Sequence, residues 1–113
     1  MKHKVVLVPF PFDDLSSAKV RPAVCLTEPI GQHRHVVLAF ITSRVPDEPL
    51  STDLVFTETA KDFSATGLRV SSTLQLHRMM TVATNIIVRE LGILPMPAQK
   101  AVEGKLKLLF GIK

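Results

Sequence analysis

The sequence predicts a mainly β domain: a small, strongly bent antiparallel barrel at about residues 4–94, followed by one helix at about 97–110. Short runs of Val, Leu, Ile and Phe alternate with irregular loops that contain Pro, Gly, Asp and Ser. The last part of the chain instead repeats its apolar residues at three- and four-residue spacing. The length of 113 residues and the 46% of hydrophobic residues predict a single domain, residues 1–113, with a core of its own.

The first two expected strands span residues 5–10 and 21–27. Both are short and rich in Val or Leu, which is typical of strands that are buried on both faces. The connection between them is too long for a tight hairpin, so we expect a shaped loop of the kind that often carries function. Pro22 favours an extended backbone at Arg21. The Arg21 guanidinium would then lie at the mouth of the strand, where it can bind an anion.

The later strands are expected at residues 35–41, 53–57 and 68–80. The third of these segments predicts one or two strands, with a bend at Ser71-Ser72. Residues 86–93 fit either a strand or a turn of helix.

The C-terminal segment predicts an amphipathic helix that packs on the barrel. Pro97 suits the first turn of this helix, and Gly111 suits its end. The apolar face consists of Ala98, Ala101, Val102, Leu106 and Leu109.

The composition restricts the partners and the cellular location. The 14 Lys and Arg residues exceed the 10 Asp and Glu residues, and a net charge of +4 suits a polyanionic partner, although many basic proteins bind none. The single cysteine, Cys25, is expected to be a small buried hydrophobe, and one cysteine cannot form a disulfide within the chain. No apolar stretch is long enough to cross a bilayer. The basic start is like that of a signal peptide, but prolines interrupt the apolar run that follows it. We therefore expect a cytoplasmic protein.

Residues 5–24, VVLVPFPFDDLSSAKVRPAV, resemble the opening of the MazF/PemK family of toxin ribonucleases. The resemblance continues in Phe40-Ile41-Thr42-Ser43, in Thr81-Val82 and in residues 88–94, and it covers most of the chain. It implies an SH3-like barrel that usually forms a homodimer and has a cognate antitoxin. It also implies a sequence-specific endoribonuclease that cuts single-stranded RNA to a 2′,3′-cyclic phosphate and a 5′-hydroxyl.

The sequence contains no nucleotide-binding glycine motif and no His, Cys, Asp and Glu cluster with the spacing of metal ligands. We therefore expect no cofactor and no metal. RNA supplies its own nucleophile, because the 2′-hydroxyl attacks the neighbouring phosphate, and DNA lacks that group. The protein then needs a proton acceptor, a proton donor and groups that stabilise charge on the phosphate.

Four residues are candidates for this catalysis. By their sequence alone, Arg21 would be a surface residue that pairs with nearby acids, and Thr42 would be a polar residue that ends a strand. The resemblance instead gives Arg21 the role of a phosphate clamp and Thr42 that of a hydroxyl donor, which Ser43 would share. His77 stands where many family members have an acidic residue. A half-exposed strand histidine and a catalytic acid or base are equally good interpretations of it, and the second predicts activity that titrates near neutral pH.

A second set of residues is expected to contact the RNA. The cations would bind phosphates, although each taken singly is more often an ordinary solvated charge. Phe12 could stack on a base, although a place in the core or a role as loop anchor is the commoner one, and Asp14 would orient Arg21 or Lys19 or hold the loop. The whole set is Phe12, Asp14, Lys19, Arg44, Gln75 and Arg78.

Two alternative functions stay open. The related CcdB-type toxins poison DNA gyrase through a C-terminal Trp-Gly-Ile, and this chain ends in the similar Phe110-Gly111-Ile112-Lys113. A glycine after a helix also has a plain capping role. The other alternative is an inactive family member that binds RNA with salt-dependent affinity and does not cut it.

Overall fold

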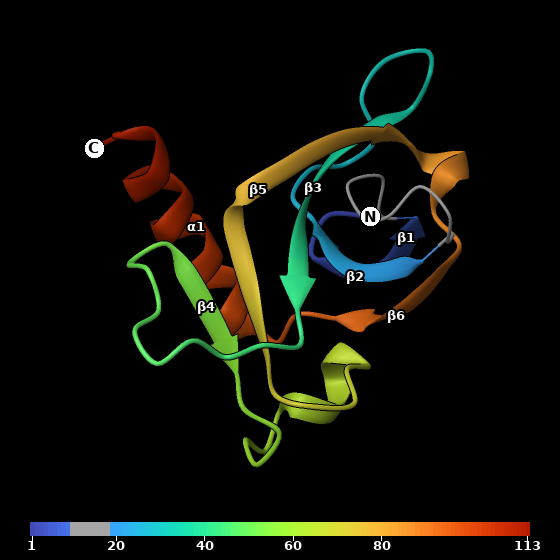
Figure 1. Cartoon of the computed structure of the whole chain (residues 1–113). Coiled ribbons are helices and arrows are strands. Elements are labelled where there is room, and N and C mark those ends of the chain that lie inside the picture. Colours follow the sequence, from blue (N-terminus) through green and yellow to red (C-terminus); the bar gives the residue numbers. More distant parts are fainter. Residues whose placement is uncertain (10–18) are drawn as a thin grey trace.

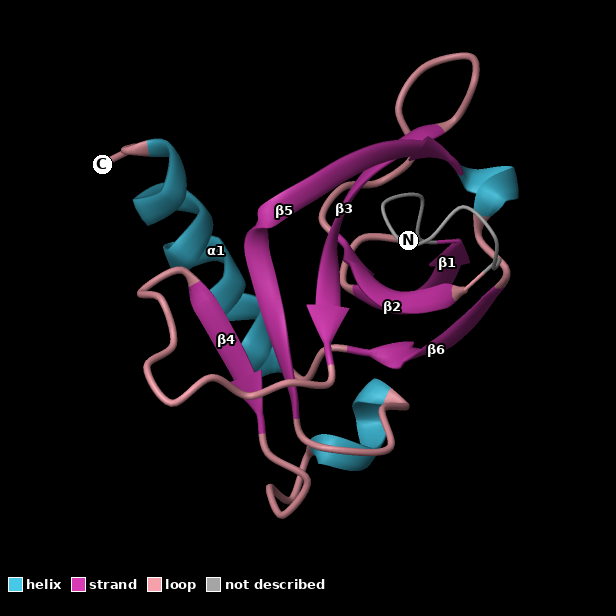
Figure 2. Ribbon diagram, in the orientation of Figure 1, coloured by secondary structure: helices cyan, strands magenta, loops and turns pink. Residues whose placement is uncertain are grey.

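A computed structural model describes residues 1–9 and 19–113 of the chain. Its six strands form one antiparallel sheet in the order β4-β5-β3-β2-β1-β6. The sheet curls into a half-barrel, and the helix α1 lies beside β4 and β5 (Figures 1 and 2). The elements in chain order are β1 (Lys4–Pro9), β2 (Val20–Cys25), β3 (His35–Thr42), β4 (Asp53–Phe56), the 3₁₀ turn η1 (Phe63–Thr66), β5 (Ser72–Ala83), the 3₁₀ turn η2 (Thr84–Ile86), β6 (Arg89–Ile93) and α1 (Met96–Phe110).

The predicted fold class, mainly β with a C-terminal helix, is confirmed. Strands β1, β2 and β3 are buried on both faces, as their continuous apolar runs indicate. Neighbouring residues such as Val5 and Val6 therefore belong to two different hydrophobic clusters, because successive side chains of a strand point to opposite faces. Cys25 is buried in the second cluster, and this burial raises the pKa of its thiol to about 11.

The helix packs on the first cluster with the face that the sequence predicts. Val102 is buried there, and Ala98, Leu106 and Leu109 pack against it. Helix α1 begins one residue before the expected start, with a proline in its first turn. Gly111 ends it in the left-handed conformation, with φ of +67°.

Two segments differ from the expected boundaries by more than two residues. Residues 68–71 precede β5, and a single strand continues from Ser72 to Ala83. Its pairing with β3 shifts sharply, since Ala39 lies opposite Met79 whereas Ile41 lies opposite Leu74. Residues 75–78 therefore form a bulge at which β5 bends, as Figure 1 shows. The ambiguous segment 86–93 contains the end of η2 and then the edge strand β6. The predicted loop between the first two strands lies almost entirely outside the described residues.

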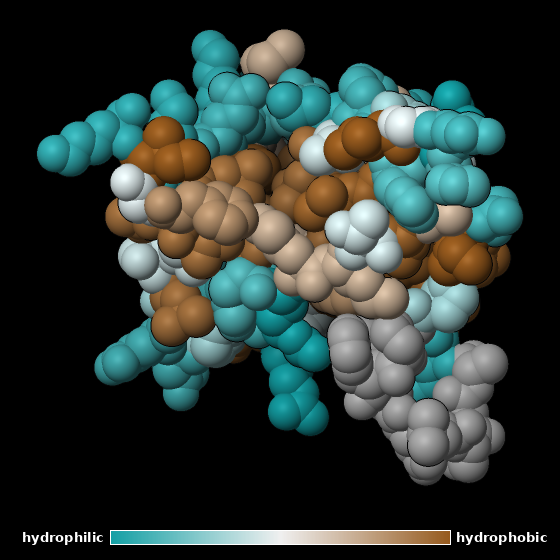
Figure 3. Space-filling model, turned by 90° about the horizontal axis from the view of Figure 1, so that it is seen from above, coloured by the Kyte–Doolittle hydropathy of each residue, from teal (hydrophilic) through white to brown (hydrophobic). Residues whose placement is uncertain are grey.

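The surface carries a large amount of apolar area. Figure 3 shows apolar residues gathered in a band across one face, with hydrophilic residues around it. Large apolar side chains that are exposed include those of Ile30, Val88, Met96, Leu108 and Phe110. Such contiguous apolar surface is typical of contact with another protein. Within the described residues, no helix has the length and hydrophobicity that crossing a membrane requires.

Candidate RNA-binding groove

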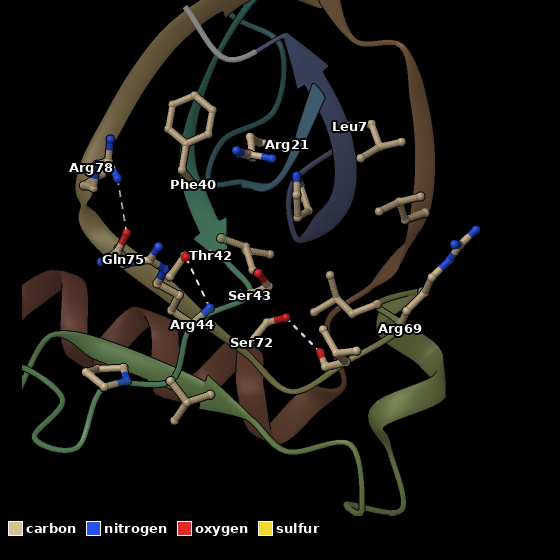
Figure 4. Close-up of a pocket in the computed structure, with 18 of the residues that line it drawn as sticks. Leu7, Arg21, Phe40, Thr42, Ser43, Arg44, Arg69, Ser72, Gln75 and Arg78 are labelled. Atoms are coloured by element: carbon tan, nitrogen blue, oxygen red, sulfur yellow. Dashed lines mark hydrogen bonds between the residues drawn. The ribbon is translucent and has the colours of Figure 1, made fainter. Parts of the chain in front are cut away.

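An open groove of about 1250 Å³ lies at the edge of the sheet where β3 ends and β2 begins. Its walls come from segments far apart in the chain: the ends of β1, β2 and β3, the loop after β3, the segment before β5, the bulge of β5, and β6. Figure 4 shows polar and cationic side chains from these segments around the groove.

Arginine dominates the charge of the groove. Five of the six arginines in the chain line it, whereas none of the eight lysines is among its described lining residues. Asp47 is the only carboxylate among those lining residues. A guanidinium has a planar set of donors that binds phosphate in a bidentate manner, which an ammonium group cannot do. The arginines are Arg21, Arg44, Arg69, Arg78 and Arg89.

Arg21 extends into the middle of the groove between Phe40 and Leu7 (Figure 4). It lies in β2 opposite Val8 of β1, and its side chain is half-buried. The following Pro22 fits the extended strand, as the sequence predicts. The sheet therefore fixes the backbone from which this guanidinium projects.

Thr42 and Ser43 lie at the end of β3, and both line the groove. The backbone N–H of Arg44 donates to Thr42 Oγ1 at 3.3 Å, and the buried Thr73 hydroxyl donates to the Arg44 carbonyl at 2.8 Å. These two bonds hold the turn that follows the strand. A hydroxyl has two acceptor lone pairs and one donor proton, so the bond from Arg44 leaves the Thr42 proton available to a ligand.

The bulge in β5 explains why Gln75 and Arg78 both line the groove. In a regular strand, residues three apart point to opposite faces. Here they lie on the same side, and Arg78 Nη1 donates to Gln75 Oε1 at 3.5 Å (Figure 4). Both expected RNA contacts on this strand therefore reach the same groove as Arg21.

Two of the other expected site residues, His77 and Lys19, are not among the described residues that line the groove. The His77 side chain is exposed and is not among the residues that line it. Lys19 is also exposed and does not line the described groove. Phe12 and Asp14 lie outside the described residues. The described part of the chain has no group of three or more His, Cys, Asp or Glu side chains that would hold a metal ion.

Arg69 and Arg89 were not among the site residues predicted from the sequence. Arg69 lies in an irregular segment, and Arg89 is opposite Leu7 in the pairing of β6 with β1. Arg69 has no local motif that marks it, and Arg89 lies in the segment 88–94, for which the resemblance named no site residue. A signal that both share is the choice of arginine over lysine, and that choice acquires meaning only when the fold brings the arginines together.

Comparisons with known proteins point to one family. A family model described as a PemK-like, MazF-like toxin of type II toxin-antitoxin system matches residues 2–110. No curated protein sequence matches the chain at a significant level.

Several solved structures share the fold. The Mycobacterium tuberculosis toxin MazF-mt6 has a TM-score of 0.74 and 19% identity, over 97% of this chain and 98% of that one. A chain of the MazE–MazF complex from Deinococcus radiodurans has a TM-score of 0.73 and 18% identity, over 98% and 95%. An endoribonuclease from a mycobacterial species, solved with its cognate antitoxin, has a TM-score of 0.72 and 11% identity, over 100% and 96%. At such low identities these similarities establish the fold alone.

Proposed function

This chain belongs to the PemK-like, MazF-like toxins of type II toxin-antitoxin systems, and on that premise we propose that it is a metal-independent endoribonuclease that cuts single-stranded RNA at a specific sequence. The observation that carries the proposal is the position of Arg21 and Thr42 in one groove among four further arginines. Two solved structures of the same fold are described as endoribonucleases from mycobacterial species, which supports the same activity.

In the proposed reaction the 2′-hydroxyl attacks the adjacent phosphorus. A 2′-O–P bond forms as the bond to the 5′-oxygen breaks, which leaves a 2′,3′-cyclic phosphate and a 5′-hydroxyl. One proton leaves the 2′-hydroxyl, and another reaches the departing 5′-oxygen. Arg21 clamps the phosphate, because a guanidinium hardly ever loses its proton and so suits charge stabilisation better than proton transfer.

The neighbouring residues complete the phosphate site in this proposal. Thr42 donates its hydroxyl proton to a phosphate oxygen, and Ser43 shares this role. Arg44, Gln75 and Arg78 hold the RNA on either side. Phe12, Asp14 and Lys19 keep the roles that are expected of them from the sequence. The proposal gives His77 no role in the reaction, because its side chain is not among the groove residues.

We propose an antitoxin as the protein partner, with an acidic segment that lies across the arginines of the groove. The mycobacterial endoribonuclease solved with its cognate antitoxin and the MazE–MazF complex support this partner. We also propose a homodimer, which would cover part of the exposed apolar surface. The proposed location is the cytoplasm, where the RNA substrate is present.

The test is a cleavage assay on a long mixed-sequence RNA in EDTA, with the 5′ ends of the products mapped. We expect cuts at one recurring short sequence. Arg21→Ala should lower the rate by about 10²–10³-fold, as for the loss of one group that stabilises a transition-state oxyanion. His77→Ala should stay active, with a pH profile like that of the wild type.

Arg34→Ala is the matched control for charge, because Arg34 is the one arginine outside the described groove lining. It should cut at the wild-type rate. An RNA with a 2′-deoxy nucleotide at the mapped site should resist cleavage, because the nucleophile is missing. Equal cutting by wild type and Arg21→Ala, or cutting that EDTA abolishes, would contradict the proposal.

A further inference from the structure

Arg69 and Arg89 line the groove but take no part in the chemistry proposed above. Arg69 lies between η1 and β5, and Arg89 is the first residue of β6. Both side chains are exposed, and neither forms an ion pair with a carboxylate that the structure describes. The half-buried Lys4 of β1, in contrast, pairs with a carboxylate, that of Glu90, at 3.2 Å. The two arginines therefore retain their full capacity to bind an anion.

The fold brings Arg69 and Arg89 to the same wall. Gly67 has φ of +74°, and a Cβ there would collide with the Leu91 carbonyl. A Cβ at Gly92 would likewise collide with the backbone of Ala65 and Thr66. The chain after η1 is thus in direct backbone contact with β6. Arg69 lies two residues after Gly67, and Arg89 lies two residues before Leu91, so each arginine is close in sequence to this contact.

This wall is far from the other end of the groove. Figure 4 places Arg69 at the opposite end from Arg78 and Gln75, with Thr42 and Ser43 between them. A phosphate at Arg21 and Thr42 would therefore leave Arg69 and Arg89 beyond the reacting group. An RNA strand carries a phosphate at every nucleotide, so a strand that continues along the groove places a later phosphate near this pair.

We propose that Arg69 and Arg89 form a second phosphate-binding site, which holds the RNA backbone on one side of the scissile phosphate. The inference rests on the proposed ribonuclease function, and it adds that the substrate must extend beyond the cut on that side. A site of this kind contributes affinity and register but little to the chemical step, because it does not touch the reacting atoms.

The first test measures RNA binding without cleavage. A 2′-O-methyl RNA that contains the mapped site is titrated with wild type, Arg69→Gln, Arg89→Gln and the double variant over a range of salt concentrations. Each single variant should weaken binding about three- to tenfold. The slope of log affinity against log salt should become shallower by about 0.7 per lost contact, and by about 1.4 in the double variant. Arg34→Gln, with the same charge change outside the groove, should match the wild type.

The second test locates the site along the RNA. Cleavable RNAs are shortened stepwise from the 5′ side or the 3′ side of the cut. Shortening on one side only should remove the KM difference between wild type and the double variant, while kcat stays within about twofold. Equal salt slopes for wild type and the double variant, or a difference that survives shortening on both sides, would overturn the inference. A wild type that neither binds nor cuts RNA would overturn the ribonuclease proposal as well.

Discussion

Thr73 shows how a single buried hydroxyl can organise the proposed site without contacting a ligand. Its side chain is fully buried, and its register places it opposite Thr42 of β3 and Val55 of β4. The hydroxyl donates to the Arg44 carbonyl, while the Arg44 N–H donates to Thr42. Arg44, two residues after the strand, is therefore held by both of its backbone polar groups. We infer that Thr73 positions Thr42 and Arg44 toward the groove.

Thr73→Val keeps the shape of the side chain and removes the hydroxyl. Because a neutral hydrogen bond contributes about 1 kcal/mol, we expect kcat for RNA cleavage to fall about five- to tenfold. Thr73→Ser should restore most of the activity, since it returns the donor. Thermal unfolding of each variant shows whether the fold is retained. A folded Thr73→Val protein with the wild-type kcat would show that the bond does not position the site.

The sequence and the structure agree best at residues that belong to a local motif. The placement of Arg21 and Thr42 at the groove could be predicted because both lie in motifs that carry the family resemblance. Their local sequence alone indicated only a surface arginine before Pro22 and a polar residue that ends a strand. Arg69 and Arg89 could not be predicted, because their function depends on a contact between η1 and β6, and nothing local encodes that contact. The placement of His77 outside the groove also depends on an irregularity, the bulge in β5.

At the scale of elements, the contact between η1 and β6 closes one wall of the groove. Gly67 and Gly92 make it possible, since each faces the backbone of the other segment where a side chain would collide. No local pattern in the sequence indicated that β6 would need a glycine at position 92. Close approach of two backbones is a property of the pair of segments, so neither segment reveals it alone.

Gly92→Ala and Gly104→Ala are a matched pair of substitutions with opposite expected effects. Gly104 lies within α1 with nothing within 4 Å of an added Cβ, so alanine there should raise stability by about 0.5–1 kcal/mol. Alanine at position 92 must displace the backbone of Ala65 and Thr66, so we expect a loss of about 1–3 kcal/mol or more. Denaturant unfolding measures both effects. A Gly92→Ala protein as stable as the wild type would show that the contact between η1 and β6 is loose.

At the scale of the whole molecule, the two kinds of basic residue are separated. Five of the six arginines line the groove, while none of the eight lysines is among its described lining residues. The net charge of +4 therefore understates the positive potential at the groove, where five arginines face one described carboxylate. The overall charge in the sequence predicted a polyanionic partner, but only the curled sheet concentrates that charge. An acidic antitoxin segment and RNA would then compete for one surface.

Substitutions at the C-terminus can distinguish the proposed ribonuclease function from the gyrase alternative. Phe110 and Ile112 are each 60% exposed, so they are free to contact a partner. The Gly111 and Ile112 N–H groups also donate to the carbonyls of Leu108 and Lys107, which is the usual way a helix ends at glycine. A deletion of this tail would remove that cap and weaken the helix. Substitution of the two exposed side chains is therefore the cleaner experiment.

We expect the double variant Phe110→Ala and Ile112→Ala to cut RNA within about twofold of the wild-type rate, because both side chains are remote from the groove lining. It should also arrest growth like the wild type when expressed without an antitoxin, whereas Arg21→Ala should not. A gyrase supercoiling assay with all three proteins completes the comparison. Inhibition of supercoiling that the double variant loses and Arg21→Ala keeps would establish the gyrase function instead. RNA binding by the wild type without cleavage or growth arrest would identify an inactive family member.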